Sequence, residues 1–313
     1  VAGSVQGTKD GIGKEAKLEI VQHLAMGPDG KVWFTSRGAK DKNAIRTLDP
    51  KTWEVKTVIG TDNALINNTH LWGSTFDSKG NYYVAGKAAG KVFKIAAGTN
   101  EISVLPLPAH KLTSNPMCVL TDAQDNLYLL NRANPSYISV YDKNLVLKHD
   151  WPVSLSAEHM AWNKDKTKLY IGTSGAPFGI FEFDPATGEM KKIAGTKDKP
   201  ANAAATTDGE PGNPLTATIG QIEGMAVDAE GNLWFSDVTT ATVRVLVPGE
   251  GGDYSKGTVK TRAGMNFVSK YPGVDGLGTN AGLKYPCGLL PMPDGSMLLA
   301  DGTGFTIRRI YSK

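Results

Sequence analysis

The 313-residue sequence predicts an all-β fold, a six-bladed β-propeller of four-stranded antiparallel blades. Three observations lead to this prediction. A β-hairpin pattern, clearest at residues 221–237, occurs six times; each copy continues into further strand-like segments; and no helical periodicity separates the copies. One such hairpin cannot bury its faces alone, so neighbouring copies are expected to pack together.

The clearest hairpin joins an apolar run around Met225 to a second run, Leu233-Trp234-Phe235. The turn between them contains Gly231, which can take a positive φ without steric cost. The other five copies also have a polar turn followed by an apolar second strand. The six second strands are predicted to begin at Val32, Tyr82, Leu127, Leu169, Leu233 and Met297.

A third strand follows each hairpin, and alternation such as Val243-Arg244-Val245 is the period-two signal of a half-buried strand. A more polar fourth strand follows in most copies. The N-terminal strand is expected to complete the last blade, closing the ring and removing a free edge. The prediction is one domain, residues 1–313, with blades at approximately 17–60, 70–107, 115–153, 156–195, 221–264 and 285–313 plus 1–5.

Charge and composition exclude some classes of protein. The chain has 34 basic and 31 acidic residues and no Lys/Arg block, which argues against a nucleic-acid partner. It has no transmembrane run and no signal peptide; Val1 opens in what looks like the end of a strand, so a removed leader or missing upstream residues are expected. We therefore expect an extracytoplasmic protein, whether periplasmic, secreted or on the cell surface. Cys118 and Cys287 are expected to be free thiols, because a disulfide needs Cα atoms within about 7 Å.

A composite motif recurs three times: Ala-Gly at a strand end, then an Asp-Gly loop, then an apolar residue. It resembles the repeat of the NHL family of six-bladed propellers, and its strong and weak copies cover almost the whole chain. The resemblance implies the fold and not the activity, since such propellers include binding proteins, lyases and lactonases. Residues 23–36 are also similar to streptogramin lyase repeats. The good copies are Ala2-Gly3 with Asp10-Gly11, Ala194-Gly195 with Asp208-Gly209, and Ala263-Gly264 with Asp275-Gly276.

The first strand of each blade is expected to line the central channel. Four positions before the hairpin turn, where the resemblance implies glycine, blades one and four have His23 and His159. The preceding position is Glu158 in blade four and Glu223 in blade five. These four residues could bind zinc or calcium, and His23, His159 and Glu223 are the catalytic candidates. The alternative is that the histidines fill the channel and hydrogen-bond to backbone or water. Gluconolactonase-like propellers have a Glu, Asn and Asp set at the axis, of which only Glu223 has an obvious match.

Two long joins between blades, residues 196–220 and 265–285, are expected on the same face as the connections that follow the second strands. Long loops on a rigid scaffold commonly bind ligands. Arg37 and Arg132 could together bind a carboxylate or phosphate. Trp72 could provide a flat surface on which a sugar stacks. Alternatively, such loop charges are only solvated. The predicted ligand-binding residues are Arg37, His70, Trp72, Lys87, Arg132, Asp237 and Asp301.

These observations favour a recognition scaffold that binds a small polar molecule, a glycan or a protein partner on the loop-bearing face. The alternative is a metal-dependent lyase or lactonase with its site at the axial channel mouth. A purely structural or assembly role is the third possibility. The serines follow no Gly-x-Ser-x-Gly pattern, so no nucleophile motif supports a serine hydrolase.

Overall fold

The computed structural model describes residues 1–38, 42–67, 69–108, 115–133, 135–196, 207–264 and 273–311. These residues form six antiparallel sheets, and their only helical segments are six 3-10 turns of three residues each. None of these helices could cross a bilayer. The predicted fold class, a six-bladed β-propeller of four-stranded antiparallel sheets, is confirmed. Residues 197–206 and 265–272, within the two predicted long joins, lie outside the described residues.

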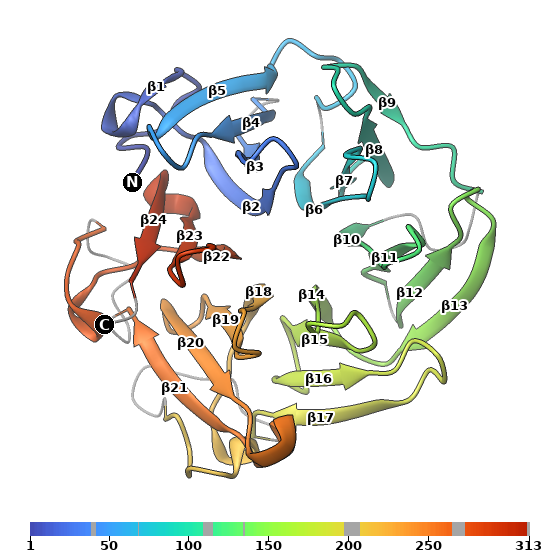
Figure 1. The fold of residues 1–313 in the computed structure, drawn as a ribbon, viewed down its shortest axis with the longest axis vertical. Coiled ribbons are helices and arrows are strands. Elements are labelled where there is room, and N and C mark those ends of the chain that lie inside the picture. Colours follow the sequence, from blue (N-terminus) through green and yellow to red (C-terminus); the bar gives the residue numbers. More distant parts are fainter. Residues whose placement is uncertain are drawn as a thin grey trace. The chain divides into compact units, whose positions relative to one another are not determined.

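The chain divides into two compact units, of which the first contains Val1–Ser154 and Phe305–Arg308. Its three sheets have their first strands, β2, β6 and β10, side by side (Figure 1). The first sheet carries the short strand β1 (Gly11–Ile12) against its outer strand. The strands of this unit are β2 (Ile20–Met26), β3 (Val32–Arg37), β4 (Ala44–Leu48), β5 (Glu54–Ile59), β6 (Leu71–Phe76), β7 (Tyr82–Gly86), β8 (Lys91–Ile95), β9 (Ile102–Val104), β10 (Pro116–Thr121), β11 (Leu127–Asn131), β12 (Ser136–Tyr141) and β13 (Leu147–Val153).

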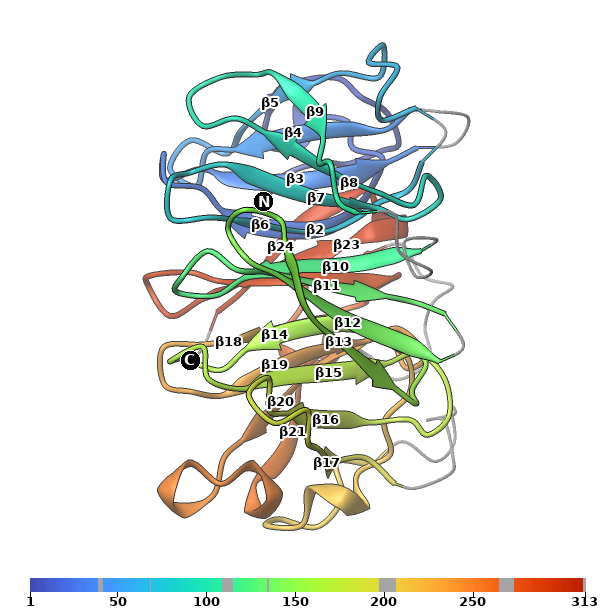
Figure 2. The same cartoon turned by 90° about the vertical axis from the view of Figure 1, so that its right-hand side faces the viewer.

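The second unit contains Leu155–Gly304 and Arg309–Lys313. Its sheets repeat the order of the first unit, with β14 (Ala157–Trp162), β18 (Ile222–Val227) and β22 (Pro286–Pro291) adjoining one another. Figure 2 shows its sheets from the side, in yellow-green to red. The remaining strands are β15 (Leu169–Thr173), β16 (Ile180–Phe183), β17 (Met190–Ala194), β19 (Leu233–Asp237), β20 (Thr242–Val247), β21 (Thr258–Ala263), β23 (Met297–Asp301) and β24 (Thr306–Ile310).

The strand pattern explains where the hydrophobic core lies. All six second strands begin at the residue predicted from the sequence. Alternate residues of these strands point between neighbouring sheets, where Ile45 of the first sheet packs in one cluster with Tyr82 and Phe93 of the second. Packing of sheet on sheet therefore buries the apolar faces that a single blade would leave exposed.

The N-terminal residues contact β24 at a single antiparallel bridge between Ala2 and Ile307. The Val1 amine also donates to the Ile307 carbonyl at 2.7 Å. The sixth sheet accordingly has three named strands, β22, β23 and β24. Ring closure by a complete N-terminal strand stays a prediction.

Every first strand contains a register shift, a feature that the sequence pattern did not reveal. In β2, for example, Val21 faces Ser36 while His23 faces Thr35, so Gln22 is an extra residue that bulges from the ladder. The same irregularity recurs at the equivalent point of the other five sheets. The residues at the shift are Gln22, Trp72, Met117, Glu158, Glu223 and Cys287.

Two fully buried arginines connect the Asp-Gly loops to the third strands. Arg46 in β4 donates to the Asp10 carboxylate at 2.8 Å and to the backbone carbonyls of Lys9 and Lys17. Asp10 also accepts from the amide and hydroxyl of Thr57. Burial alone would raise the pKa of Asp10, but the hydrogen bonds from Thr57 and Arg46 outweigh it and hold the pKa below its ordinary value.

The second unit repeats this arrangement. Arg244 in β20 donates to the Asp208 carboxylate and to the carbonyls of Thr207 and Thr218, and Asp208 accepts from Thr261. We call each set of contacts an arginine clip. The aspartate of the repeated motif is therefore a structural ligand of a buried guanidinium.

We expect Asp208→Asn to lower the free energy of unfolding by about 1–3 kcal/mol, because Arg244 would lose the nearer of its two carboxylates and keep only Asp237 at 4.0 Å. Chemical denaturation measures this change. The control is Glu54→Gln, which breaks an exposed pair with Lys56 and should change stability by at most about 0.5 kcal/mol. Equal effects of the two substitutions would contradict the structural role of the clip.

Candidate functional site

The first unit brings four predicted ligand-binding residues together at the junction of its first two sheets. Arg37 ends β3, His70 and Trp72 lie at the start of β6, and Lys87 follows β7. The Arg37 Cζ atom lies 5.2 Å from the centroid of the Trp72 ring, and the Lys87 Nζ atom lies 4.2 Å from it. Both are cation–π contacts. We call Arg37, His70, Trp72 and Lys87 the cationic cluster.

Trp72 is buried, with 5% of its surface exposed. Its ring is therefore not a platform on which a sugar could stack, contrary to the sequence-based expectation. The indole instead presents the negative charge density of its face to two cations. This attraction offsets part of the repulsion between Arg37 and Lys87.

Arg37 has no acidic partner among the described residues. The Arg37 Nε atom is buried and has no hydrogen-bond partner, and within the described residues no carboxylate forms an ion pair with Arg37. His70 is exposed beside it; partial burial, and then the positive charges of Arg37 and Lys87, lower the pKa of its imidazole below the ordinary value. An anion would stabilise all three side chains.

Arg132 belongs to the same unit but to a different sheet. It follows β11, and its amide donates to the Asn115 carbonyl at 2.9 Å. The cation that shares the indole with Arg37 is Lys87 and not Arg132. The sequence suggested that Arg37 acts together with Arg132. In the structure, the second cation beside Arg37 is Lys87.

Asp237 and Asp301 are fully buried in the second unit. Asp237 accepts hydrogen bonds from the amides of Gly220 and Thr239, and burial raises the pKa of its carboxyl. Asp301 accepts from the amides of Lys284 and Tyr285. Both carboxylates hold the loop that leads into the first strand of their own blade, so neither presents a charge to solvent.

His23 is buried and held in one tautomer. Its Nδ1 atom accepts from the Ser74 amide at 3.3 Å and lies 2.9 Å from the Ser74 hydroxyl, which in turn accepts from the Tyr82 hydroxyl at 2.8 Å. Because Nδ1 is an acceptor, the proton of the neutral ring is on Nε2. Burial lowers the pKa of His23 to about 4. Ser74 and Tyr82 were not recognised from the sequence, since they come from the next sheet.

The remaining axial candidates lie in the second unit. Glu158 and His159 are adjacent and buried in β14. The Glu223 carboxylate, buried in β18, accepts from the Gln221 amide and from the Tyr285 hydroxyl at 3.0 Å. Over the part of the chain that the structure describes, no group of three or more His, Cys, Asp or Glu side chains is arranged to hold a metal ion. Both cysteines are buried free thiols, as expected.

Solved structures with the same fold include proteins of several functions. The chain is similar to an auxiliary nutrient binding protein from Bacteroides ovatus, with a TM-score of 0.74 and 16% identity over 99% of this chain and 75% of that one. For a gluconolactonase from Xanthomonas campestris, the TM-score is 0.63 and the identity is 11%, over 91% of this chain and 84% of that one. For virginiamycin B lyase from Staphylococcus aureus, the TM-score is 0.57 and the identity is 12%, over 94% of this chain and 85% of that one.

These likenesses establish a shared fold. No protein-family model matches the chain, and no curated protein does. Membership of the NHL family stays a prediction. Since the similar structures include both a binding protein and enzymes, the fold is compatible with either class of function.

We expect acid to destabilise the protein through His23. Its pKa is about 4 when folded and about 6.5 when unfolded, so the unfolded state binds the proton first as the pH falls. Stability should therefore decrease between pH 6.5 and pH 4, by about 3 kcal/mol from this residue. Denaturation midpoints across this range measure the loss.

The matched variant is His23→Gln, which keeps a hydrogen-bond acceptor but does not titrate. Its stability should fall less steeply with acid than that of the parent protein. Parallel pH profiles for the two proteins would show that His23 does not carry this effect.

Proposed function

We propose that the protein is a binding propeller whose cationic cluster holds a small anionic molecule, such as an acidic sugar, on the loop-bearing face of the first unit. The observation that carries this proposal is the arrangement of Arg37 and Lys87 over one buried indole, with no acidic partner for Arg37 among the described residues. A buried or half-buried positive charge without a counter-ion is unfavourable. A ligand carboxylate would supply the missing charge.

The chemistry of the three side chains fits this ligand. A guanidinium can donate two parallel hydrogen bonds to a carboxylate or phosphate, and the Lys87 ammonium adds a second positive charge on the same ring. His70, which is exposed at the edge of the cluster, can add a further donor. A polar ligand is consistent with the fold's use in a nutrient binding protein from Bacteroides ovatus.

The direct test is calorimetric titration with glucuronate, using glucose as the matched neutral sugar. Glucuronate should bind and glucose should not, because only the former has a carboxylate. Arg37→Gln and Lys87→Gln should each weaken glucuronate binding at least about tenfold, the usual size of a charge-assisted hydrogen bond.

The control is Lys94→Gln, since Lys94 also lies over an aromatic ring, that of Tyr83, but outside the cluster. It should leave the affinity unchanged. Equal binding of glucose and glucuronate, or undiminished binding by the Arg37 and Lys87 variants, would overturn the proposal.

The proposed site also predicts a pH dependence. The pKa of His70 is lowered in the free protein, and a bound anion would raise it. Binding therefore takes up a proton, and glucuronate affinity should increase as the pH falls from 8 to 5. His70→Gln should remove most of this increase, whereas a pH profile unchanged by that substitution would place His70 outside the binding site.

The second candidate function is a lyase or lactonase that uses zinc or calcium at the first-strand positions. What favours it is that the second unit has buried side chains able to bind a metal at these positions: the adjacent Glu158 and His159 in β14, and the hydrogen-bonded Glu223 carboxylate in β18. Elemental analysis distinguishes the candidates. About one equivalent of metal, lost in both His159→Gln and Glu223→Gln, would favour the enzyme.

We also propose an extracytoplasmic location. A solute-capturing role like that named for the similar nutrient binding protein supports it. Cell fractionation with an antibody to the protein tests this location.

A further inference from the structure

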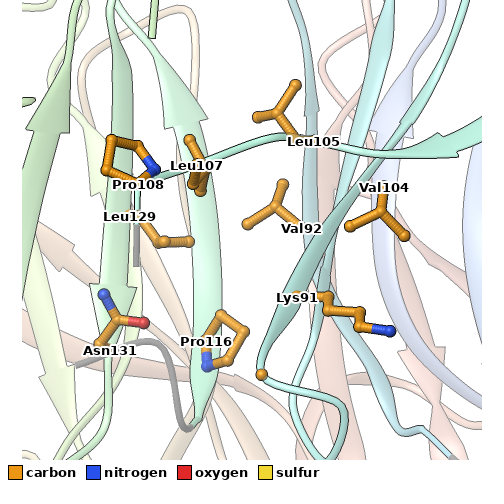
Figure 3. Close-up of a pocket in the computed structure, with 10 residues that line it drawn as sticks. Lys91, Val92, Val104, Leu105, Leu107, Pro108, Pro116, Leu129 and Asn131 are labelled. Atoms are coloured by element: carbon orange, nitrogen blue, oxygen red, sulfur yellow. The ribbon is translucent and has the colours of Figure 1, made fainter. Parts of the chain in front are cut away.

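A pocket of about 140 Å³ lies in the first unit between its second and third sheets (Figure 3). Most of the lining residues are apolar, and two of them are prolines, which have no amide hydrogen to donate, while Lys91 also lines the pocket. Asn131 lies at one end. The apolar lining consists of Val92, Val104, Leu105, Leu107, Pro108, Pro116 and Leu129.

Several residues of the pocket belong to the connections between strands, or lie next to them. Gly90 belongs to the connection from β7 to β8, Leu107 and Pro108 follow β9, and Asn131 ends β11. These are the connections that the sequence predicts on one face. The pocket is nevertheless separate from the cationic cluster, because none of the four cluster residues lines it.

Asn131 is fully buried and has one unused hydrogen-bonding atom. Its Nδ2 donates to the Ser139 hydroxyl at 3.4 Å, and that hydroxyl donates to the Asp150 carboxylate at 2.8 Å. Because the only hydroxyl proton of Ser139 is directed to Asp150, the amide group of Asn131 cannot turn over without losing a hydrogen bond. The Oδ1 atom is thereby left without a donor.

Figure 3 shows the Asn131 oxygen turned toward the side of the pocket that Pro116 occupies. A buried carbonyl oxygen without a hydrogen bond costs about 1–3 kcal/mol in a folded protein. Its presence beside an apolar space of this size indicates that a donor from outside the chain completes the site.

We propose that this pocket binds a neutral, ring-sized apolar group that carries one hydrogen-bond donor, with the donor directed to Asn131 Oδ1. The volume is close to the roughly 150 Å³ that accommodates a single six-membered ring in a protein interior. A saturated ring with one hydroxyl matches both the lining and the lone acceptor. The site goes beyond the proposed function, since it needs no anion and none of the cluster residues.

The test compares cyclohexanol with cyclohexanone by methyl NMR of the full chain labelled at leucine and valine. The two rings are alike in size, but only the alcohol has a donor, and the ketone would place a second oxygen against Oδ1. Cyclohexanol should shift the methyl signals of Val92, Leu105 and Leu129. It should bind about fivefold or more tightly than cyclohexanone, which is the effect of one hydrogen bond.

Two variants complete the experiment. Asn131→Leu removes the acceptor and should abolish the preference for the alcohol. Leu107→Trp, at a half-buried position of the wall, should fill the space and prevent binding of both rings without disturbing the buried amide network. It keeps the test decisive if Asn131→Leu does not fold.

Three results would overturn the proposal: equal affinity for the two rings, methyl shifts that persist in Leu107→Trp, or no methyl shift with either compound. The last would show that water alone satisfies Asn131. Glucuronate binding measured on the same samples is independent, so the failure of this pocket and the failure of the cationic cluster can be told apart.

Discussion

The arginine clip is the interaction on which the first strands β2 and β18 depend. A guanidinium that is fully removed from water is tolerated only when its donors are satisfied and its charge is matched. Asp10 matches the charge of Arg46, and its two terminal nitrogens donate to Asp10 and to two backbone carbonyls, while its Nε atom has no hydrogen-bond partner. One of these carbonyls is that of Lys17, which lies three residues before β2. Arg244 does the same through Asp208 and the carbonyl of Thr218, shortly before β18. Each clip therefore fixes the path by which the chain reaches a first strand.

Within each first strand, the register shift determines which residue is left out of the regular pairing with the second strand. The extra residue in each first strand is the position at which glutamine, tryptophan, methionine, glutamate or cysteine occurs. Bulges of this kind re-aim side chains and are common beside functional sites. Trp72 shows the consequence, because the shift in β6 lies where its ring contacts both Arg37 and Lys87.

The second-strand residue that pairs just before the register shift differs between the sheets. In the fifth and sixth sheets it is Asp237 or Asp301, whose carboxylate accepts amides of the incoming loop. In the first sheet the same position is Ser36, which pairs with Val21 just before the register shift, and Arg37 is the next residue. The third sheet has Asn131 at this position, and its Oδ1 atom has no hydrogen-bond partner.

The sequence by itself determined the fold class, the start of each second strand and the recurrence of the Asp-Gly loops. These features are set by local periodicity and turn chemistry, which a stretch of ten residues contains. It also brought Arg37, His70, Trp72 and Lys87 into one list of candidates. Tertiary structure alone decided that Trp72 is buried between cations, that Asp10 pairs with Arg46 some 36 residues away, and that Asn131 keeps an unused oxygen. Each of these outcomes depends on atoms from another strand or sheet, and the spacing of residues along one strand holds no information about them.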